Sequence, residues 1–171
     1  AKSLFLNRLS LTDENLKYDF FSSIELHPNL FKQYGCKQVG SNGELLEANK
    51  VVEGMGILAA LIAAKPNNEF IKECLDYFGN RHFVNPDGSL YTDIINPGIM
   101  ATLAVKYGFR YIDKTQVLDN NMIILDSSVF AGNAATLSKQ SYSMHYCDGS
   151  WREKTLVQKL KSFIRNYFLV K

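Results

Sequence analysis

Segments with helical periodicity alternate along this chain with short apolar runs, and turn residues separate them. An amphipathic helix that ends near Gly79 is predicted by apolar residues at helical spacing, namely Phe70, Ile71, Cys74, Leu75 and Phe78. Strands are predicted at 18–25, 111–112, 122–125, 128–130 and 141–147, while residues 57–64 fit either a strand or the start of a helix. Because helices and strands interleave, the expected fold class is α/β or α+β.

The residues around Asn96 have the form of a helix start. Asn96 followed by Pro97 matches an N-cap residue with proline at the first helical position. We expect this helix to run to Tyr107, with Gly108 as the residue that ends it. Turns are expected where Asn, Gly and Pro cluster, at 41–43 and at 85–88.

The C-terminal segment has the most regular pattern in the chain. A wide apolar stripe of helical period is formed by Leu156, Val157, Leu160, Phe163, Ile164, Tyr167 and Phe168, and basic residues occupy the other faces. The pattern predicts a docked amphipathic C-terminal helix. Its basic face has two interpretations: the helix covers the core, or its Lys and Arg side chains make peripheral contact with an anionic membrane surface.

Composition limits the classes of function. A chain of 171 residues that is 46% hydrophobic and 21% charged is long enough to form one domain spanning 1–171. The net charge of +2 gives no argument for a nucleic-acid partner. Three distant cysteines without a Cys-x-x-Cys spacing favour a reducing compartment over a disulfide framework or a zinc site. The most apolar stretch, 55–64, is too short to span a membrane, so a cytoplasmic location is expected.

Residues 145–151 hold the most informative side chains for chemistry. His145 offers an imidazole nitrogen to a divalent metal, and Gly149 lets the backbone approach a ligand closely. Ser150 adds a hydroxyl donor, and Trp151 adds an indole N–H and a flat face. With a helix N-terminus nearby, this set suits a metal-bound diphosphate. The alternative is that His145 and Trp151 are packing residues with one satisfied hydrogen bond each.

The stretch 142–151, Tyr-Ser-Met-His-Tyr-Cys-Asp-Gly-Ser-Trp, resembles the Tyr-Ala-Ile-His-His-x-x-Gly-Ser-Trp segment of the family 32 glycosyltransferases. Less specific likeness upstream, at 57–78 and 91–98, extends the resemblance to roughly 19–151. The resemblance implies the C-terminal part of a GT-A-like nucleotide-diphospho-sugar transferase fold, with a mixed sheet and flanking helices. It also implies retention of anomeric configuration, a Mn²⁺ or Mg²⁺ cofactor, a nucleoside-diphosphate sugar donor, and a glycan or lipid-linked acceptor, as in capsule or other surface-polysaccharide synthesis.

Carried over by position, the resemblance implies that His145 is a metal ligand. It implies that Ser150 and Trp151 contact the diphosphate and that Gly149 lets the loop approach it. The second histidine of the family segment is Tyr146 in this chain. No Asp-x-Asp occurs in the sequence, and neither does the Gly-Gly-x-Tyr that precedes it in the family. Because the family's Asp-x-Asp precedes the part that this chain resembles, we expect residues 1–171 to be the C-terminal half of a larger enzyme and to be inactive alone.

Several further polar residues are candidates with two interpretations. Asn96 and Asp93 are candidate contacts for sugar hydroxyls, although Asn96 also fits a plain helix cap. Glu25 lies on a predicted strand, where it either faces the active site or is a surface carboxylate. His27 and His82 lie beside loop residues and are expected to be surface histidines. The sequence assigns no catalytic residue.

Three classes of function remain open. The leading hypothesis is a retaining, metal-dependent glycosyltransferase seen as its C-terminal part. The second is a non-catalytic binding or scaffold module derived from such an enzyme. The third is an unrelated α/β domain, which would be indicated by a structure that places His145 and Trp151 far apart or buries both away from any cleft.

Overall fold

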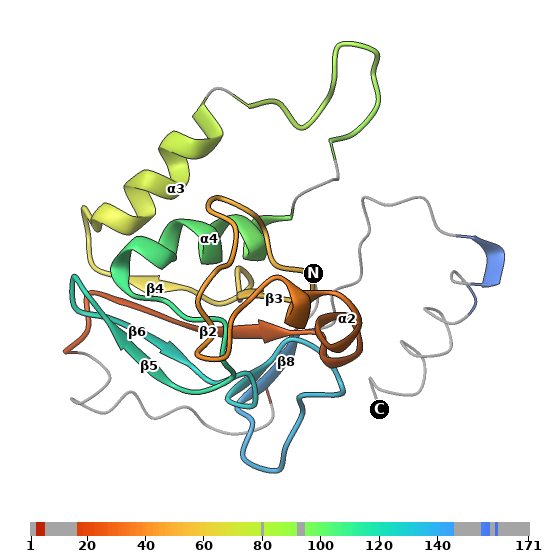
Figure 1. Cartoon of the computed structure of the whole chain (residues 1–171). Helices are drawn as coiled ribbons and strands as arrows, with labels where there is room; N and C mark the ends of the chain where they lie inside the picture. Colours follow the sequence, from red (N-terminus) through yellow and green to blue (C-terminus); the bar gives the residue numbers. More distant parts are fainter. Residues whose placement is uncertain are drawn as a thin grey trace.

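Strand β2 (Phe20–Leu26) is the centre of the larger of two sheets (Figure 1). The computed structural model describes residues 3–5, 17–79, 81–91, 95–145, 155–157 and 160. One edge of β2 pairs antiparallel with two short strands, β3 (Met55–Ile57) and β4 (Ala63–Ala64). Its other edge pairs parallel with β6 (Met122–Leu125), which pairs antiparallel with β5 (Gln116–Leu118). The sheet is therefore mixed, and the described fold is a mixed α/β fold.

The described helices are α2 (Pro28–Gln33), α3 (Glu69–Gly79) and α4 (Asn96–Ala104), with the 3₁₀ turns η1 (Gly35–Lys37) and η2 (Val105–Tyr107). Helices α3 and α4 lie on one face of this sheet, and α2 lies beyond the end of β2 (Figure 1). Phe20 of β2 packs edge-to-face on Phe70 of α3, with ring centroids 4.9 Å apart. Met100 of α4 joins the same buried cluster. Successive strand residues point to opposite faces, so Phe20 and Ile24 place their face of β2 in this core.

A second, smaller sheet lies against the other face of β2. Its strands are β1 (Ser3–Phe5), β8 (Ser143–His145) and β7 (Phe130–Ala131), with β8 in the middle, antiparallel to β1 and parallel to β7. Phe21 packs edge-to-face on Phe130 at a centroid distance of 5.6 Å, and the Ser23 hydroxyl donates to the Phe130 carbonyl at 3.4 Å. The end of β7 is therefore held over the carboxyl-terminal half of β2.

The structure confirms the main predicted elements. The strands at 18–25 and 122–125 are β2 and β6, and the helix ending at Gly79 is α3. The helix from Asn96 to Tyr107 is present as α4 followed by η2, and Gly108 ends it at φ 94°. The predicted turns at 41–43 and 85–88 each place a glycine at positive φ, 72° at Gly43 and 83° at Gly88.

Other predictions were wrong in detail. Residues 111–112 form a bend, and the strand of that region is β5, further along the chain. Residues 57–64 form neither one strand nor a helix start, because they contain the end of β3, a turn and β4. The N-cap of α4 is Ile95, with φ −93° and ψ 156° and no side-chain cap bond, so Asn96 is the first helical residue and not the cap. Leu75 of the predicted α3 stripe is 66% exposed.

Most of the predicted C-terminal helix lies outside the described residues. Leu156, Val157 and Leu160 are described as helical, and they are 84%, 63% and 60% exposed. At these three positions the prediction of a docked apolar stripe is therefore wrong. No helix in the described part of the chain is long and apolar enough to cross a membrane.

Candidate functional site

Glu25 is a buried carboxylate near the end of β2. The residue is 6% exposed, between the apolar neighbours Ile24 and Leu26 on a strand packed on both faces. Burying an ionised carboxylate is costly unless hydrogen bonds compensate the lost hydration. The interpretation of Glu25 as a surface carboxylate is therefore wrong, and its burial calls for a structural or functional reason.

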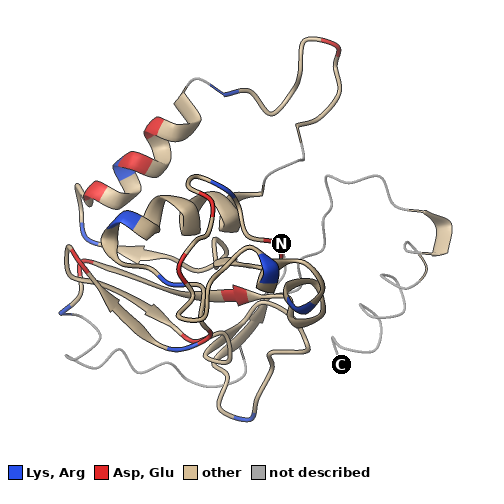
Figure 2. Cartoon of the chain, viewed as in Figure 1, with Lys and Arg blue, Asp and Glu red and all other residues tan. Residues whose placement is uncertain are grey.

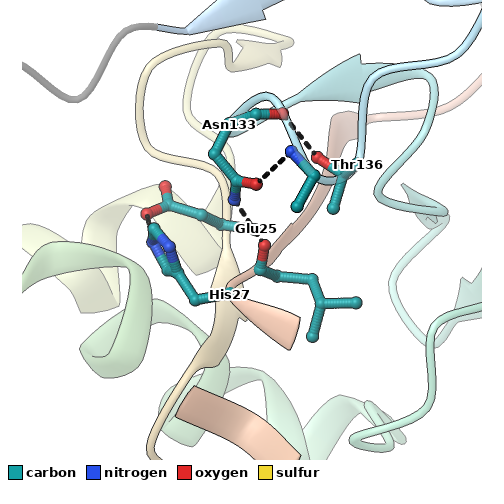
Figure 3. A network of polar contacts seen from close by, with 6 residues as sticks. Glu25, His27, Asn133 and Thr136 are labelled. Carbon is teal, nitrogen blue, oxygen red and sulfur yellow. Dashed lines mark hydrogen bonds and ion pairs between the residues drawn. The ribbon is translucent and has the colours of Figure 1, made fainter. Parts of the chain in front are cut away.

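His27 is the hydrogen-bond partner of Glu25. The two residues are two apart and project to the same side, and His27 Nε2 lies 3.3 Å from Glu25 Oε1. The His27 side chain is 39% exposed and that of Glu25 is 7% exposed. Figure 3 shows the imidazole lying against the carboxylate at the end of the strand. Within the described residues, His27 makes the one hydrogen bond to this carboxylate, so His27 is more than an ordinary surface histidine.

The loop after β7 fixes the other side of this strand end. The Asn133 amide Nδ2 donates to the Leu26 carbonyl at 2.6 Å, and its Oδ1 accepts from the Ala135 N–H at 2.9 Å (Figure 3). The Thr136 hydroxyl donates to the Asn133 carbonyl at 3.1 Å. Gly132 packs so closely that a Cβ atom there would lie 3.0 Å from Glu25 Cγ. A loop distant in sequence thus sets the position of the Glu25 side chain.

A pocket opens beside Glu25 and His27. Its remaining walls are Leu30, residues 51–56 leading into β3, and Ile95, Pro97 and Gly98 at the start of α4. Gly56 allows α4 to sit directly on β3, because a Cβ atom at Gly56 would lie 2.5 Å from the Pro97 carbonyl oxygen. The pocket therefore lies where β2, the segment leading into β3 and the start of α4 meet, and α4 approaches β3 backbone to backbone at Gly56.

His145 is the last residue of β8 and is partly buried. Its Nδ1 atom is buried and has no hydrogen-bond partner among the described residues. The parallel register pairs Ala131 with Met144, so the next residues along the two strands, Gly132 and His145, are neighbours. Because Gly132 also packs on Glu25, the structure brings His145 and Glu25 to the same end of the two sheets.

The structure describes two of the predicted site residues. Asn96 is exposed at the first turn of α4, between Ile95 and Pro97, which line the pocket. The predicted residues Asp93, Gly149, Ser150 and Trp151 lie outside the described residues. Sequence reasoning missed the Glu25–His27 pair, and the available signal was a glutamate inside a run of buried strand residues with a histidine two positions later.

The described residues do not form a complete metal site. They contain no group of three or more His, Cys, Asp or Glu side chains that could hold an ion. Among the aspartates, Asp113 is already engaged, since its Oδ1 and Oδ2 accept hydrogen bonds from the Ser127 N–H at 2.8 Å and the Ser127 hydroxyl at 2.7 Å. Nδ1 of His145, which has no partner among the described residues, is a single candidate ligand, and Mn²⁺ or Mg²⁺ would need carboxylate oxygens in addition.

A second polar cluster joins α3 to η2. Glu73 Oε1 accepts hydrogen bonds from Lys106 Nζ and, at 2.9 Å, from the Tyr107 hydroxyl. Burial raises the pKa of Glu73, but these two hydrogen bonds outweigh burial and leave the pKa below its ordinary value. Burial and the bond to Glu73 raise the pKa of Tyr107 to about 12. These hydrogen bonds link α3 to η2. Over the described elements as a whole, basic and acidic residues are interspersed (Figure 2).

In comparisons with known proteins, no family model, no curated protein and no solved structure gives a significant match to this chain. The fold and the site by themselves define a mixed α/β protein with a buried acid–histidine pair beside a pocket.

Proposed function

We propose that this chain is the C-terminal part of a retaining glycosyltransferase that resembles family 32. Its substrates would be a nucleoside-diphosphate sugar and a glycan or lipid-linked acceptor in surface-polysaccharide synthesis. The observation that carries the proposal is the position of His145 at the end of β8 and the environment of its Nδ1 atom. This histidine is the last residue of β8, and its buried Nδ1 has no hydrogen-bond partner in the described part of the chain. The segment that follows it in sequence is the one that resembles the family's diphosphate-binding loop.

The fold supports the proposal in general terms. A mixed sheet with a parallel pair, β2 and β6, and helices on one face agrees with the GT-A-like arrangement that the resemblance implies. In open α/β sheets, ligands bind beyond the carboxyl ends of the strands. Glu25 and His145 both lie at such strand ends.

A bound Mn²⁺ or Mg²⁺ would supply charge stabilisation for a departing nucleoside diphosphate. Among the described residues, His145 would contribute one ligand, and the carboxylates that such an ion prefers would have to come from elsewhere. The proposal places them in an Asp-x-Asp segment preceding the part of the family that this chain resembles. In this proposal the diphosphate is contacted by the residues that the resemblance implies, Gly149, Ser150 and Trp151.

Paramagnetic NMR tests the proposal on the chain as it stands. Mn²⁺ broadens resonances of nuclei near its site even when binding is weak, so UDP or GDP with substoichiometric Mn²⁺ is expected to broaden the amide signals of Met144, His145 and Gly132. His145→Ala should abolish this broadening. The matched control is His82→Ala, which removes an exposed histidine and should leave the broadening intact. Broadening that is absent, or that survives in His145→Ala, would contradict the proposal.

A further inference from the structure

The acidic side chains that line the pocket beside Glu25 disfavour the binding of a phosphate group. Its ionisable lining residues are Glu25, His27 and Glu53, and no Lys or Arg is among the described residues that line it. A carboxylate accepts hydrogen bonds and repels other anions. A diphosphate would therefore be disfavoured here, whereas hydroxyl groups, which donate hydrogen bonds, would be favoured.

Glu25 has unused capacity to accept such hydrogen bonds. An ionised carboxylate has two oxygens and about four acceptor positions. The described residues give this carboxylate the hydrogen bond from His27 at Oε1, although the Glu25 side chain is only 7% exposed. Ligand hydroxyls that enter the pocket would find these remaining acceptor positions available.

The rest of the pocket suits the apolar face of a sugar ring. Leu30, Met55, Ile95 and Pro97 contribute hydrocarbon surface, while Gly54, Gly56 and Gly98 expose backbone without side chains. Sites for small ligands combine apolar walls with a few placed polar groups in this way. The pocket therefore presents an apolar wall on one side and a hydrogen-bond acceptor on the other.

The pair is held in position before any ligand arrives. Gly132 packs on Glu25 Cγ, and Asn133 fixes the carbonyl of Leu26, the residue between Glu25 and His27. The hydrogen bond from His27 orients one carboxylate oxygen. Ordering these side chains in advance reduces the entropy that binding would otherwise cost.

We propose that Glu25, positioned by His27, accepts hydrogen bonds from the hydroxyl groups of an uncharged sugar unit bound in the pocket formed by β2, β3 and the start of α4. Naming the ligand as a sugar rests on the proposed function, whereas the preference for neutral hydroxyl groups over phosphate rests on the pocket alone. The sugar unit is either the acceptor or the glycosyl group of the donor, and both present the same hydroxyl chemistry.

The test is a titration of the ¹⁵N-labelled chain with the methyl glycosides of glucose, galactose, mannose and N-acetylglucosamine. At least one is expected to shift the amide signals of Gly54, Gly56 and Gly98. Glu25→Gln keeps the size of the side chain but removes its charge, and it should weaken binding ~10-fold or more, because hydrogen bonds to a charged group are stronger than those to a neutral amide. Glu47→Gln, an exposed glutamate paired with Lys50, is the matched control and should bind like the wild type.

Two further variants guard against a folding defect. Glu25→Asp keeps the charge but draws the oxygens back by one methylene, so it should weaken binding in a chain that retains its melting temperature. His27→Ala should also weaken binding, and His27→Gln, which restores a side-chain N–H, should recover part of it. Equal binding by folded Glu25→Gln and the wild type would overturn the proposal. So would a failure of both the methyl glycosides and the corresponding nucleoside-diphosphate sugars to shift the pocket amides.

The outcome separates this proposal from the proposed function. Glycoside shifts in the pocket without Mn²⁺ broadening at His145 would retain the sugar site and reject the transferase. Mn²⁺ broadening at His145 without any sugar-dependent shift at the pocket would retain the transferase proposal and reject the sugar site. A nucleoside-diphosphate sugar that shifts the pocket amides where its methyl glycoside does not would identify the donor as the source of the sugar unit and would still require Glu25.

Discussion

Gly132 lies against the side chain of Glu25, close enough that a Cβ atom at residue 132 would be 3.0 Å from Glu25 Cγ. We predict that Gly132→Val displaces Glu25 and lowers the free energy of unfolding by about 1–3 kcal/mol, the usual cost of overpacking. Urea denaturation measures this change in the free energy of unfolding. Gly79→Ala is the control, because nothing lies within 4 Å of a Cβ atom at Gly79 and the change should be neutral or slightly stabilising. Equal stability of the two variants would refute the close packing.

Asn133 fastens its loop to β2 through one short hydrogen bond, from Nδ2 to the Leu26 carbonyl at 2.6 Å. Asn133→Asp removes this donor but keeps an acceptor for the Ala135 N–H, and Asn133→Ala removes both. We expect each variant to lose about 1–3 kcal/mol of stability because the Leu26 carbonyl loses its partner, with the larger loss in Asn133→Asp, which also turns a charged oxygen toward that carbonyl. Thermal melts compare them with Asn42→Ala in an exposed turn, which should change little.

The ion pair between Glu73 and Lys106 predicts a contribution to folding stability that is present at neutral pH and lost in acid. Because the folded pKa of Glu73 is below its ordinary value of 4.5, its contribution is fully present above that value and is lost as the pH falls through the folded pKa. Glu73→Gln should therefore lower the free energy of unfolding at pH 7 and flatten its fall in acid. Urea denaturation across a pH series gives both slopes, and parallel curves for variant and wild type would contradict the prediction.

The two described cysteines should differ widely in reactivity. Cys36 is exposed, whereas Cys74 is buried on α3, and burial followed by the charge of Glu73 raises its pKa to about 11. Since the thiolate is the reactive form, we expect a Cys147→Ser chain to release one equivalent of thionitrobenzoate rapidly at pH 8 and a second one only in urea. In Cys36→Ser/Cys147→Ser the rapid phase should vanish. A rapid phase that persists there would show that Cys74 is accessible.

The regular elements of the fold were predictable where a local pattern is strong. The aromatic and small residues of β2 and the 3.6-residue spacing of α3 are properties of one segment, and both elements are confirmed. The strand β5 was missed because it has three residues, of which Val117 is 65% exposed, so it shows no clear alternation. The cap of α4 was misplaced by one residue, because proline is tolerated throughout the first turn and does not fix where the helix begins.

The candidate site was predictable only in part for a different reason. The environment of Glu25 depends on Gly132 and Asn133, which lie more than 100 positions away along the chain, and no local pattern reports a long-range contact of this kind. The exposure of Leu75 has a similar origin, since a stripe predicts which side chains are able to pack but not which element covers them. His145 was found from its sequence context, and its place beside Gly132 follows from strand register.

The parallel pairing of β2 with β6 has a consequence for synthesis of the chain. Strand β2 is made before its partner β6, because Phe20 pairs with Met122, and the central hydrogen-bonded ladder cannot close until that later strand leaves the ribosome. At about 5–20 residues per second, the delay is on the order of 5–20 s. During this time the unprotected edge of a strand containing Phe20, Phe21 and Ile24 is exposed to other chains. Yield of soluble protein should therefore depend on chaperones and on expression temperature more than on the stability of the finished fold.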